Sequence, residues 1–77
     1  MHLSKEEIRP KLRVRTTALR SGDGIVLPAR NLSVRKRGIT GTVLGAVLNT
    51  DQNIWLVRHD RTSDEGAYCY NELELLK

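Results

Sequence analysis

Hydrophobic and polar residues alternate along residues 11–16, which gives the first clear pattern in the chain. Leu12, Val14 and Thr16 share one face of this segment, and basic side chains occupy the other face. A period of two is typical of a strand with one face buried. The segment is therefore predicted to be the first strand.

Further strands are predicted downstream, bounded by polar turn residues, at residues 38–48, 54–60 and 67–70. The second of these alternates so that Trp55, Val57 and His59 share a face, which we expect to be the core face. Residues 71–73 fit a tight 3-10 turn, and residues 74–76 fit a short closing strand.

A long connection, residues 17–33, separates the first two strands. It contains a strong turn signal, Ser-Gly-Asp-Gly, at residues 21–24, and then a short apolar run that ends at Pro28. We expect a long excursion there with a short hairpin or arm inside it.

About five short strands cannot bury the apolar face of one flat sheet unless that sheet curls over on itself. We therefore predict an all-β fold, a small barrel of about five strongly bent antiparallel strands. Residues 1–77 are predicted to form a single domain, with residues 1–10 as an N-terminal extension. Ser4 and Glu7 have the spacing of a capping box, and Pro10 stops any helix, so the extension should contain a short helical turn.

The cysteine and apolar content exclude several classes of protein. Cys69 is the lone cysteine, so the chain has no internal disulfide, and no His and Cys cluster has metal-ligand spacing. No stretch approaches the ~18 apolar residues that span a bilayer, and the N-terminus lacks the pattern of a secretion signal. We expect a cytoplasmic protein with no metal, no cofactor and no membrane partner.

Charge is distributed unevenly along the chain. Residues 1–37 carry ten Lys and Arg against three acidic residues, whereas residues 38–77 carry three against six. This asymmetry predicts a face suited to polyanions or acidic proteins. The alternative interpretation is a solvated surface that keeps the protein soluble.

The candidate residues for binding such a partner are five basic side chains and one aromatic, namely Arg13, Arg15, Arg35, Lys36, Arg37 and Tyr70. The cluster at residues 35–37 precedes Gly38, so its cations could converge on phosphate from a loop. Trp55 and Tyr68 are expected in the core, which leaves Tyr70 as the exposed aromatic. The alternative is a charged loop and an edge strand that its cations protect from aggregation.

Three segments resemble the motifs of SH3-like barrels, and they read G-x-x-G-x-V at residues 38–43, W-L-V-R-H-D at 55–60 and Y-x-x-x-E-L at 68–73. The resemblance extends over residues 12–76 in order and implies an SH3-like barrel with a 3-10 turn before the last strand. It says little about function, because unrelated families share these strand and turn requirements.

Relatives within that superfamily suggest several functions. Residues 34–43 resemble a KOW element, which implies contact with RNA or with neighbouring proteins. The layout also resembles the barrel subunits of photosystem I and of ferredoxin–thioredoxin reductase, which stabilise a larger complex or dock an acidic protein. Plasmid-borne dihydrofolate reductase is a third relative by fold. Its Val-Gln-Ile-Tyr motif is replaced here by Ala-Tyr-Cys-Tyr at residues 67–70, so that activity is not carried over.

Catalysis is not expected. His59 and Asp60 adjoin, and Cys69 could lie on a neighbouring strand, but adjacent strand residues face opposite ways. No third member or oxyanion hole is evident. We expect a non-catalytic binding module or accessory subunit for an acidic macromolecule, with nucleic acid favoured over acidic protein. The alternatives are a structural subunit that pairs in a homodimer or larger complex and, more remotely, an enzyme built as an oligomeric pore.

Overall fold

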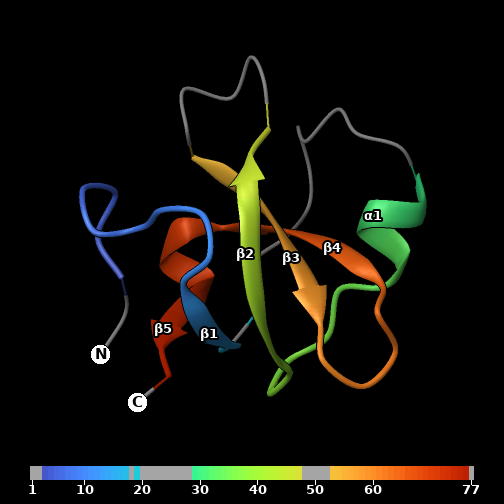
Figure 1. The fold of residues 1–77 in the computed structure, drawn as a ribbon. Helices are drawn as coiled ribbons and strands as arrows, with labels where there is room; N and C mark the ends of the chain where they lie inside the picture. The colour runs from blue at the N-terminus through green and yellow to red at the C-terminus, as the bar shows by residue number, and fades with distance from the viewer. Residues whose placement is uncertain (1–2, 18, 20–28, 48–52, 77) are drawn as a thin grey trace.

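The computed structural model describes residues 3–17, 19, 29–47 and 53–76. Five strands form one antiparallel sheet in the order β4-β3-β2-β1-β5 (Figure 1). In chain order, the elements are β1 (Arg13–Thr16), α1 (Ala29–Ser33), β2 (Thr40–Ala46), β3 (Ile54–His59), β4 (Glu65–Cys69), the 3-10 helix η1 (Tyr70–Glu72) and β5 (Leu73–Leu75). The prediction of an all-β antiparallel fold is confirmed.

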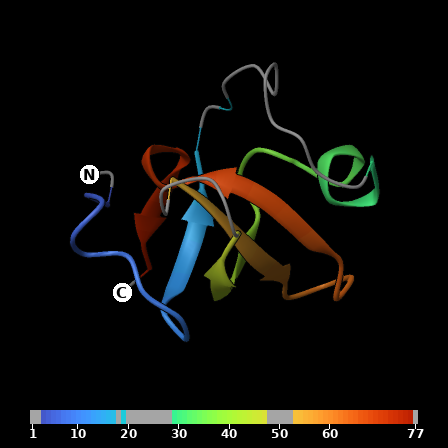
Figure 2. The ribbon, with the colours of Figure 1, turned by 90° about the horizontal axis from the view of Figure 1, so that it is seen from above.

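The sheet is open, although its strands curl around a common interior (Figure 2). In the part of the chain that the structure describes, β4 and β5 are the two edges of the sheet and do not pair with each other. Closure into a barrel, as the sequence predicts, is therefore not observed. β5 has only three residues, which gives it few backbone groups with which to close a barrel.

The sheet is irregular where the sequence places its spaced glycines. The register between β2 and β3 shifts between Val43 and Gly45, as at a β-bulge, which bends the strand. At Gly41, a Cβ atom would overlap the carbonyl oxygen of Arg58 and lie 2.9 Å from Cγ1 of Val57. Glycine at this position lets β2 approach β3 closely.

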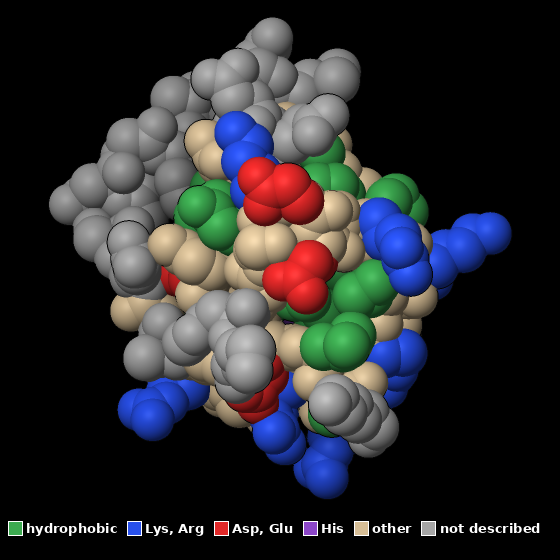
Figure 3. Space-filling view, turned by 90° about the vertical axis from the view of Figure 1, so that its left-hand side faces the viewer, with side chains coloured by type: hydrophobic (Ala, Val, Ile, Leu, Met, Phe, Trp, Pro, Cys, Tyr) green, Lys and Arg blue, Asp and Glu red, His purple; other side chains and the backbone are tan. Residues whose placement is uncertain are grey.

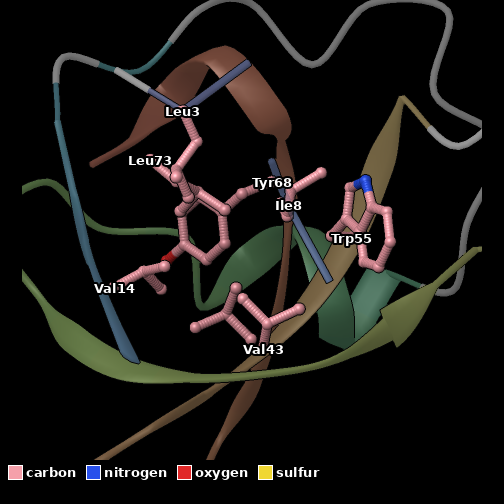
Figure 4. Close-up of a cluster of buried hydrophobic side chains, with 8 residues drawn as sticks. Leu3, Ile8, Val14, Val43, Trp55, Tyr68 and Leu73 are labelled. Carbon is pink, nitrogen blue, oxygen red and sulfur yellow. The ribbon is translucent and has the colours of Figure 1, made fainter. Parts of the chain in front are cut away.

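The core lies on the concave side of the sheet, with Tyr68 at its centre (Figure 4). Its most deeply buried hydrophobic members come from five strands: Val14, Val43, Val57, Tyr68 and Leu73. Trp55 and His59 are also buried, so the predicted core face of β3 is confirmed. Because each strand contributes mainly one deeply buried side chain, short strands are sufficient to form the hydrophobic core of this chain.

The N-terminal segment packs onto this core. The predicted helical turn is present as a single hydrogen-bonded turn, in which the amide of Ile8 donates to the carbonyl of Ser4 over 3.3 Å. The Ser4 amide donates in turn to Oε1 of Glu7, as the capping-box spacing indicates. Leu3 and Ile8 are buried, and the Leu3 amide donates to the carbonyl of Leu73. Residues 3–8 of the predicted extension therefore contribute directly to the core.

The predicted connection between the first two strands ends in a helix. Residues 29–33 form α1, which the sequence did not predict, whereas the predicted hairpin or arm falls on residues outside the described ranges. Nδ2 of Asn31 donates to the carbonyl of Glu65 over 2.7 Å, which ties the helix to β4. Residues 18 and 20–28, including the turn signal, lie outside the described residues. Across the described ranges, no helix is long and apolar enough to cross a membrane.

Candidate anion-binding site

Ion pairs connect the basic and acidic halves of the sequence in the described part of the folded chain. Ion pairs of the described residues join basic side chains from residues 1–37 to acidic side chains from residues 38–77, namely Arg13–Asp60, Arg15–Glu74 and Arg35–Glu72. Antiparallel pairing of β1 with β5 places Arg15 opposite Glu74, and the pairing of β2 with both β1 and β3 brings Arg13 near Asp60. On the folded surface, Arg13 and Arg15 of the basic half are therefore paired with carboxylates of the acidic half.

Arg13 is fully engaged with Asp60. Both terminal nitrogens of Arg13 donate to the two carboxylate oxygens of Asp60 over 2.6 Å, a bidentate arrangement. The hydroxyl of Thr40 donates to the same carboxylate over 2.8 Å. These hydrogen bonds, that from Arg13 first, lower the pKa of Asp60 to about 2. At neutral pH the Asp60 carboxylate is therefore ionised, and Arg13 is paired with it.

The sheet face around β1 and β5 carries both kinds of charge. Nε of Arg15 donates to Oε1 of Glu74 over 2.6 Å on this face. Figure 3 shows acidic and hydrophobic side chains together in its middle, with Lys and Arg mostly toward the margins. This face is therefore not a uniform basic surface.

Arg35 is turned inward, away from the two basic residues that follow it. Its side chain is 7% exposed, and Nη2 lies 2.5 Å from Oε2 of Glu72, whose side chain is 1% exposed. The second carboxylate oxygen of Glu72 accepts from the amide of Cys69 over 2.8 Å. The Arg35 guanidinium also lies 5.7 Å from the ring centroid of Tyr68. The predicted cluster thus splits into a buried Arg35 and an exposed Lys36 and Arg37.

Residues 35–39 are held in place by buried partners. The hydroxyl of Tyr68 accepts from the amide of Lys36 over 3.0 Å, and the hydroxyl of Thr16 donates to the Lys36 carbonyl over 2.6 Å. Gly38 follows with a φ of 79°, and its amide donates to the carbonyl of Thr16 over 2.9 Å. A positive φ is favourable for glycine, which allows the turn into β2. Lys36 is therefore presented on a rigid backbone.

A pocket of about 580 Å³ lies between this segment and the turn that joins β3 to β4. These two segments run beside each other below α1 in Figure 1. Its charged lining consists of Lys36, Arg61 and Asp64, with Val34 and Ile39 as apolar wall residues. Within the described part of the chain, no carboxylate pairs with Lys36 or Arg61. The pocket therefore combines cations from two loops that have no carboxylate partner among the described residues.

Sequence reasoning did not identify Arg61. It follows the third strand by two positions in a polar turn, where a lone basic residue carries no motif. Its relation to Lys36 depends on the β3–β4 turn meeting the segment before β2, which no local pattern predicts. A smaller adjoining pocket of about 450 Å³ shares Ser33, Val34 and Asp64 and adds Arg30 from α1.

His59 lines the inner side of the larger pocket. Its Nε2 lies 2.8 Å from the hydroxyl oxygen of Tyr68, the same oxygen that accepts from the Lys36 amide. Burial lowers the pKa of His59, and the charge of Lys36 acts in the same direction, whereas Asp64 opposes them. His59 is therefore neutral at pH 7, and a neutral imidazole has one donor nitrogen and one acceptor nitrogen.

The remaining candidates do not assemble into a site. Tyr70 is partly buried against the core, and its amide donates to the carbonyl of Asn53. Cys69 pairs in register with Ile54, at the opposite end of β3 from His59, so a thiol–imidazole pair is absent among the described residues. Nor does any group of three or more His, Cys, Asp or Glu in the described ranges have the arrangement of a metal site.

Compared with known proteins, the chain matches no family model, no curated protein sequence and no solved structure.

Proposed function

We propose that this chain is a non-catalytic module that binds an acidic macromolecule, with nucleic acid as the favoured partner, at the pocket between residues 33–40 and 59–64. The observation that carries the proposal is the convergence of Lys36 and Arg61 from two different loops onto one pocket, with the exposed Arg37 beside them. Cations without a carboxylate partner are available to neutralise phosphate and release its counterions.

The contrast with the other predicted cations supports this location. Arg13 and Arg15 are paired on the sheet face, and Arg35 is buried. Lys36, in comparison, is exposed while its backbone is held at both its amide and its carbonyl. A side chain on a fixed backbone loses less conformational freedom on binding, which favours affinity.

We further propose that the open sheet is a member of the SH3-like class of small barrels. The strand order β4-β3-β2-β1-β5 supports this, as does the 3-10 helix directly before β5. The motifs at residues 38–43, 55–60 and 68–73 fall on β2, β3 and the β4–β5 segment, as the resemblance implies. The free Cys69 is compatible with a reducing compartment, and we propose the cytoplasm.

Fluorescence anisotropy with labelled single-stranded RNA, single-stranded DNA and duplex DNA tests the binding proposal. The site variant is K36A/R37A/R61A, and the charge-matched control is K5A/R9A/K11A, which removes three exposed cations that precede β1. If three phosphates are neutralised, log K should fall with log[salt] at a slope of about −2 to −3. The site variant should lose most of this binding, and the control should keep most of it.

Two results would overturn the proposal. The first is that no nucleic acid binds at low salt, and the second is that the two triple variants weaken binding equally. Equal weakening would mean that net charge, rather than the pocket, accounts for the interaction.

A second candidate function is a structural subunit that associates through a sheet edge. β5 is an edge strand of the open sheet, and Leu75 on it is 46% exposed, which makes it a large hydrophobic residue at the surface. Exposed edge strands are templates for pairing with another chain, including a second copy. Sedimentation equilibrium at two salt concentrations separates the candidates, because edge pairing should depend on protein concentration and persist in high salt. A monomer at all concentrations would exclude self-association.

A further inference from the structure

The unpaired cations described above gather at the pocket and do not form an extended line along the surface. Proteins that follow a nucleic-acid strand combine a basic groove along the backbone with aromatic residues on which bases stack. Here Arg13 and Arg15, which would extend a track along the sheet, are paired with Asp60 and Glu74. In the described part of the surface near the pocket, the cations without a carboxylate partner are instead those of the pocket itself.

No aromatic side chain is placed to stack a series of bases beside the pocket. Trp55 and Tyr68 are 6% and 0% exposed, and Tyr70 packs partly against the core at the η1 end of β4. His59 and the Tyr68 hydroxyl are the ring groups nearest the pocket, and they are bonded to each other. In the described residues, the surface beside the pocket therefore lacks both the basic groove and the stacking aromatic residues that usually bind along a nucleic-acid strand.

The pocket itself is chemically suited to a compact anion. Lys36 and Arg61 contribute two cations, and Ser33 and Thr62 are further polar residues of the lining. The Ser33 hydroxyl already donates to the carbonyl of Arg30 over 3.4 Å. The Thr62 hydroxyl oxygen accepts from the Asp64 amide, so its proton is available to donate to a ligand. Asp64 also lines the pocket, and its carboxylate reduces the positive charge available there.

The contact between His59 and Tyr68 bears on which nitrogen of His59 carries a proton. The Lys36 amide occupies an acceptor site of the Tyr68 hydroxyl, and the single hydroxyl proton is 2.8 Å from His59 Nε2 but 3.5 Å from the Lys36 carbonyl, as measured between heavy atoms. We assign this proton to the shorter bond, which makes Nε2 the acceptor. The neutral imidazole then carries its own proton on Nδ1.

We propose that this pocket binds the terminal phosphate monoester of a nucleic-acid strand, in preference to the phosphodiesters within the strand. The inference depends on the proposed function, since it names the part of the nucleic acid that enters the site. A terminal phosphate carries up to two negative charges near neutral pH, whereas a phosphodiester carries one, so two converging cations favour the terminus. Arg37 lies outside the pocket lining and is exposed, so it is available to contact the adjoining diester.

The test compares one internally labelled DNA oligonucleotide in three forms, with a 5′-phosphate, with a 3′-phosphate and with two hydroxyl ends. A phosphorylated form should bind about tenfold more tightly than the hydroxyl form, the effect of one strong charge-assisted contact. K36Q/R61Q should abolish this preference, while K5Q/K11Q, which removes the same charge elsewhere, should retain it. D64N should increase the preference, because it removes the carboxylate that opposes the anion.

The possible outcomes separate this inference from the proposed function. Equal binding of all three forms, with salt dependence that K36A/R37A/R61A removes, would overturn the terminal-phosphate inference and leave the proposed function intact. Binding of none of the forms would refute both. Tighter binding of a phosphoserine peptide than of the phosphorylated oligonucleotide would also overturn the inference, since the anion would then belong to a protein.

Discussion

Arg35 and Glu72, which are 37 residues apart in the sequence, form an ion pair in the interior of the protein. Nη2 of Arg35 lies 2.5 Å from Oε2 of Glu72, and the two side chains are 7% and 1% exposed. The pair joins the segment before β2 to the 3-10 helix before β5. It therefore fixes the residue next to Lys36 and helps to determine where that cation is presented.

Removal of Arg35 should be strongly destabilising. R35A removes the Arg35 guanidinium from the buried carboxylate of Glu72, and breaking such a buried ion pair typically costs about 3–5 kcal/mol. Exposed R37A should change stability by less than about 0.5 kcal/mol. Urea unfolding followed by circular dichroism measures both. In R35M/E72Q, which removes both charges and keeps an acceptor for the Cys69 amide, most of the stability should return. Equal effects of R35A and R37A would contradict the buried ion pair.

The stability of the protein should fall as the pH drops below about 6.5 because of His59. Burial lowers the pKa of the folded histidine from its ordinary 6.5, with Lys36 acting in the same direction and Asp64 against it. The unfolded chain therefore binds a proton at a higher pH than the folded chain does, and this favours unfolding at acidic pH. The contribution is fully present above 6.5 and is lost as the pH falls toward the folded pKa.

H59Q provides the test of this pH dependence, because glutamine can accept a hydrogen bond from the Tyr68 hydroxyl and does not titrate. The free energy of unfolding, measured at pH 7.5, 6.5 and 5.5, should fall less steeply with acidity in H59Q than in the wild type. His2 is unchanged in the variant. The pKa of Asp60 is lowered from 3.8 to about 2 in the folded chain. Its contribution to the free energy of unfolding is therefore lost between these two pH values, well below the pH range of the experiment. Parallel pH profiles would refute the role assigned to His59.

Two glycines of β2 should respond differently to alanine. In G41A the new methyl group would overlap the carbonyl oxygen of Arg58, so the two strands must separate, at a cost of about 1–3 kcal/mol. In G45A no atom lies within 4 Å of the new group, and the change should stay within about 1 kcal/mol. Thermal unfolding of the two variants measures the difference. A larger loss in G45A than in G41A would be inconsistent with the close approach of β2 and β3.

Release of Arg13 and Arg15 from their carboxylates should extend the basic surface. D60N/E74Q keeps the shapes of both acidic side chains but removes their charges. If the two arginines then reach phosphate, the salt slope of nucleic-acid binding should steepen by about 1.5. E6Q/E7Q makes the same change in net charge away from these pairs. If both variants change the salt slope equally, the ion pairs with Asp60 and Glu74 do not prevent Arg13 and Arg15 from contacting phosphate.

Local patterns in the sequence predicted the strands well. Alternation identified β1 and the core face of β3, because a period of two reports directly on which side of a strand is buried. The 3-10 turn and the closing strand were each expected one residue later than they occur, at Tyr70–Glu72 and Leu73–Leu75. Element boundaries depend on hydrogen bonds such as that from the Tyr70 amide to the Asn53 carbonyl, which the sequence does not reveal.

The candidate site was harder to predict because it depends on distant pairing. Arg15 and Glu74 are 59 residues apart, and nothing in the local sequence of either indicates the other. The basic run at residues 35–37 has no periodic pattern from which the inward turn of Arg35 could be inferred. Arg61 joins Lys36 only because the β3–β4 turn folds against the segment before β2. Of the two cations that line the pocket, the sequence therefore indicated Lys36 and not Arg61.

The most direct test of the proposed binding site is a titration of ¹⁵N-labelled protein with a short single-stranded oligonucleotide, followed by amide chemical shifts. The largest changes should fall within residues 33–40 and 59–64, and they should disappear in K36A/R37A/R61A but persist in K5A/R9A/K11A. Changes centred instead on β1 and β5, or on residues 3–12, would contradict the assignment of the site to this pocket.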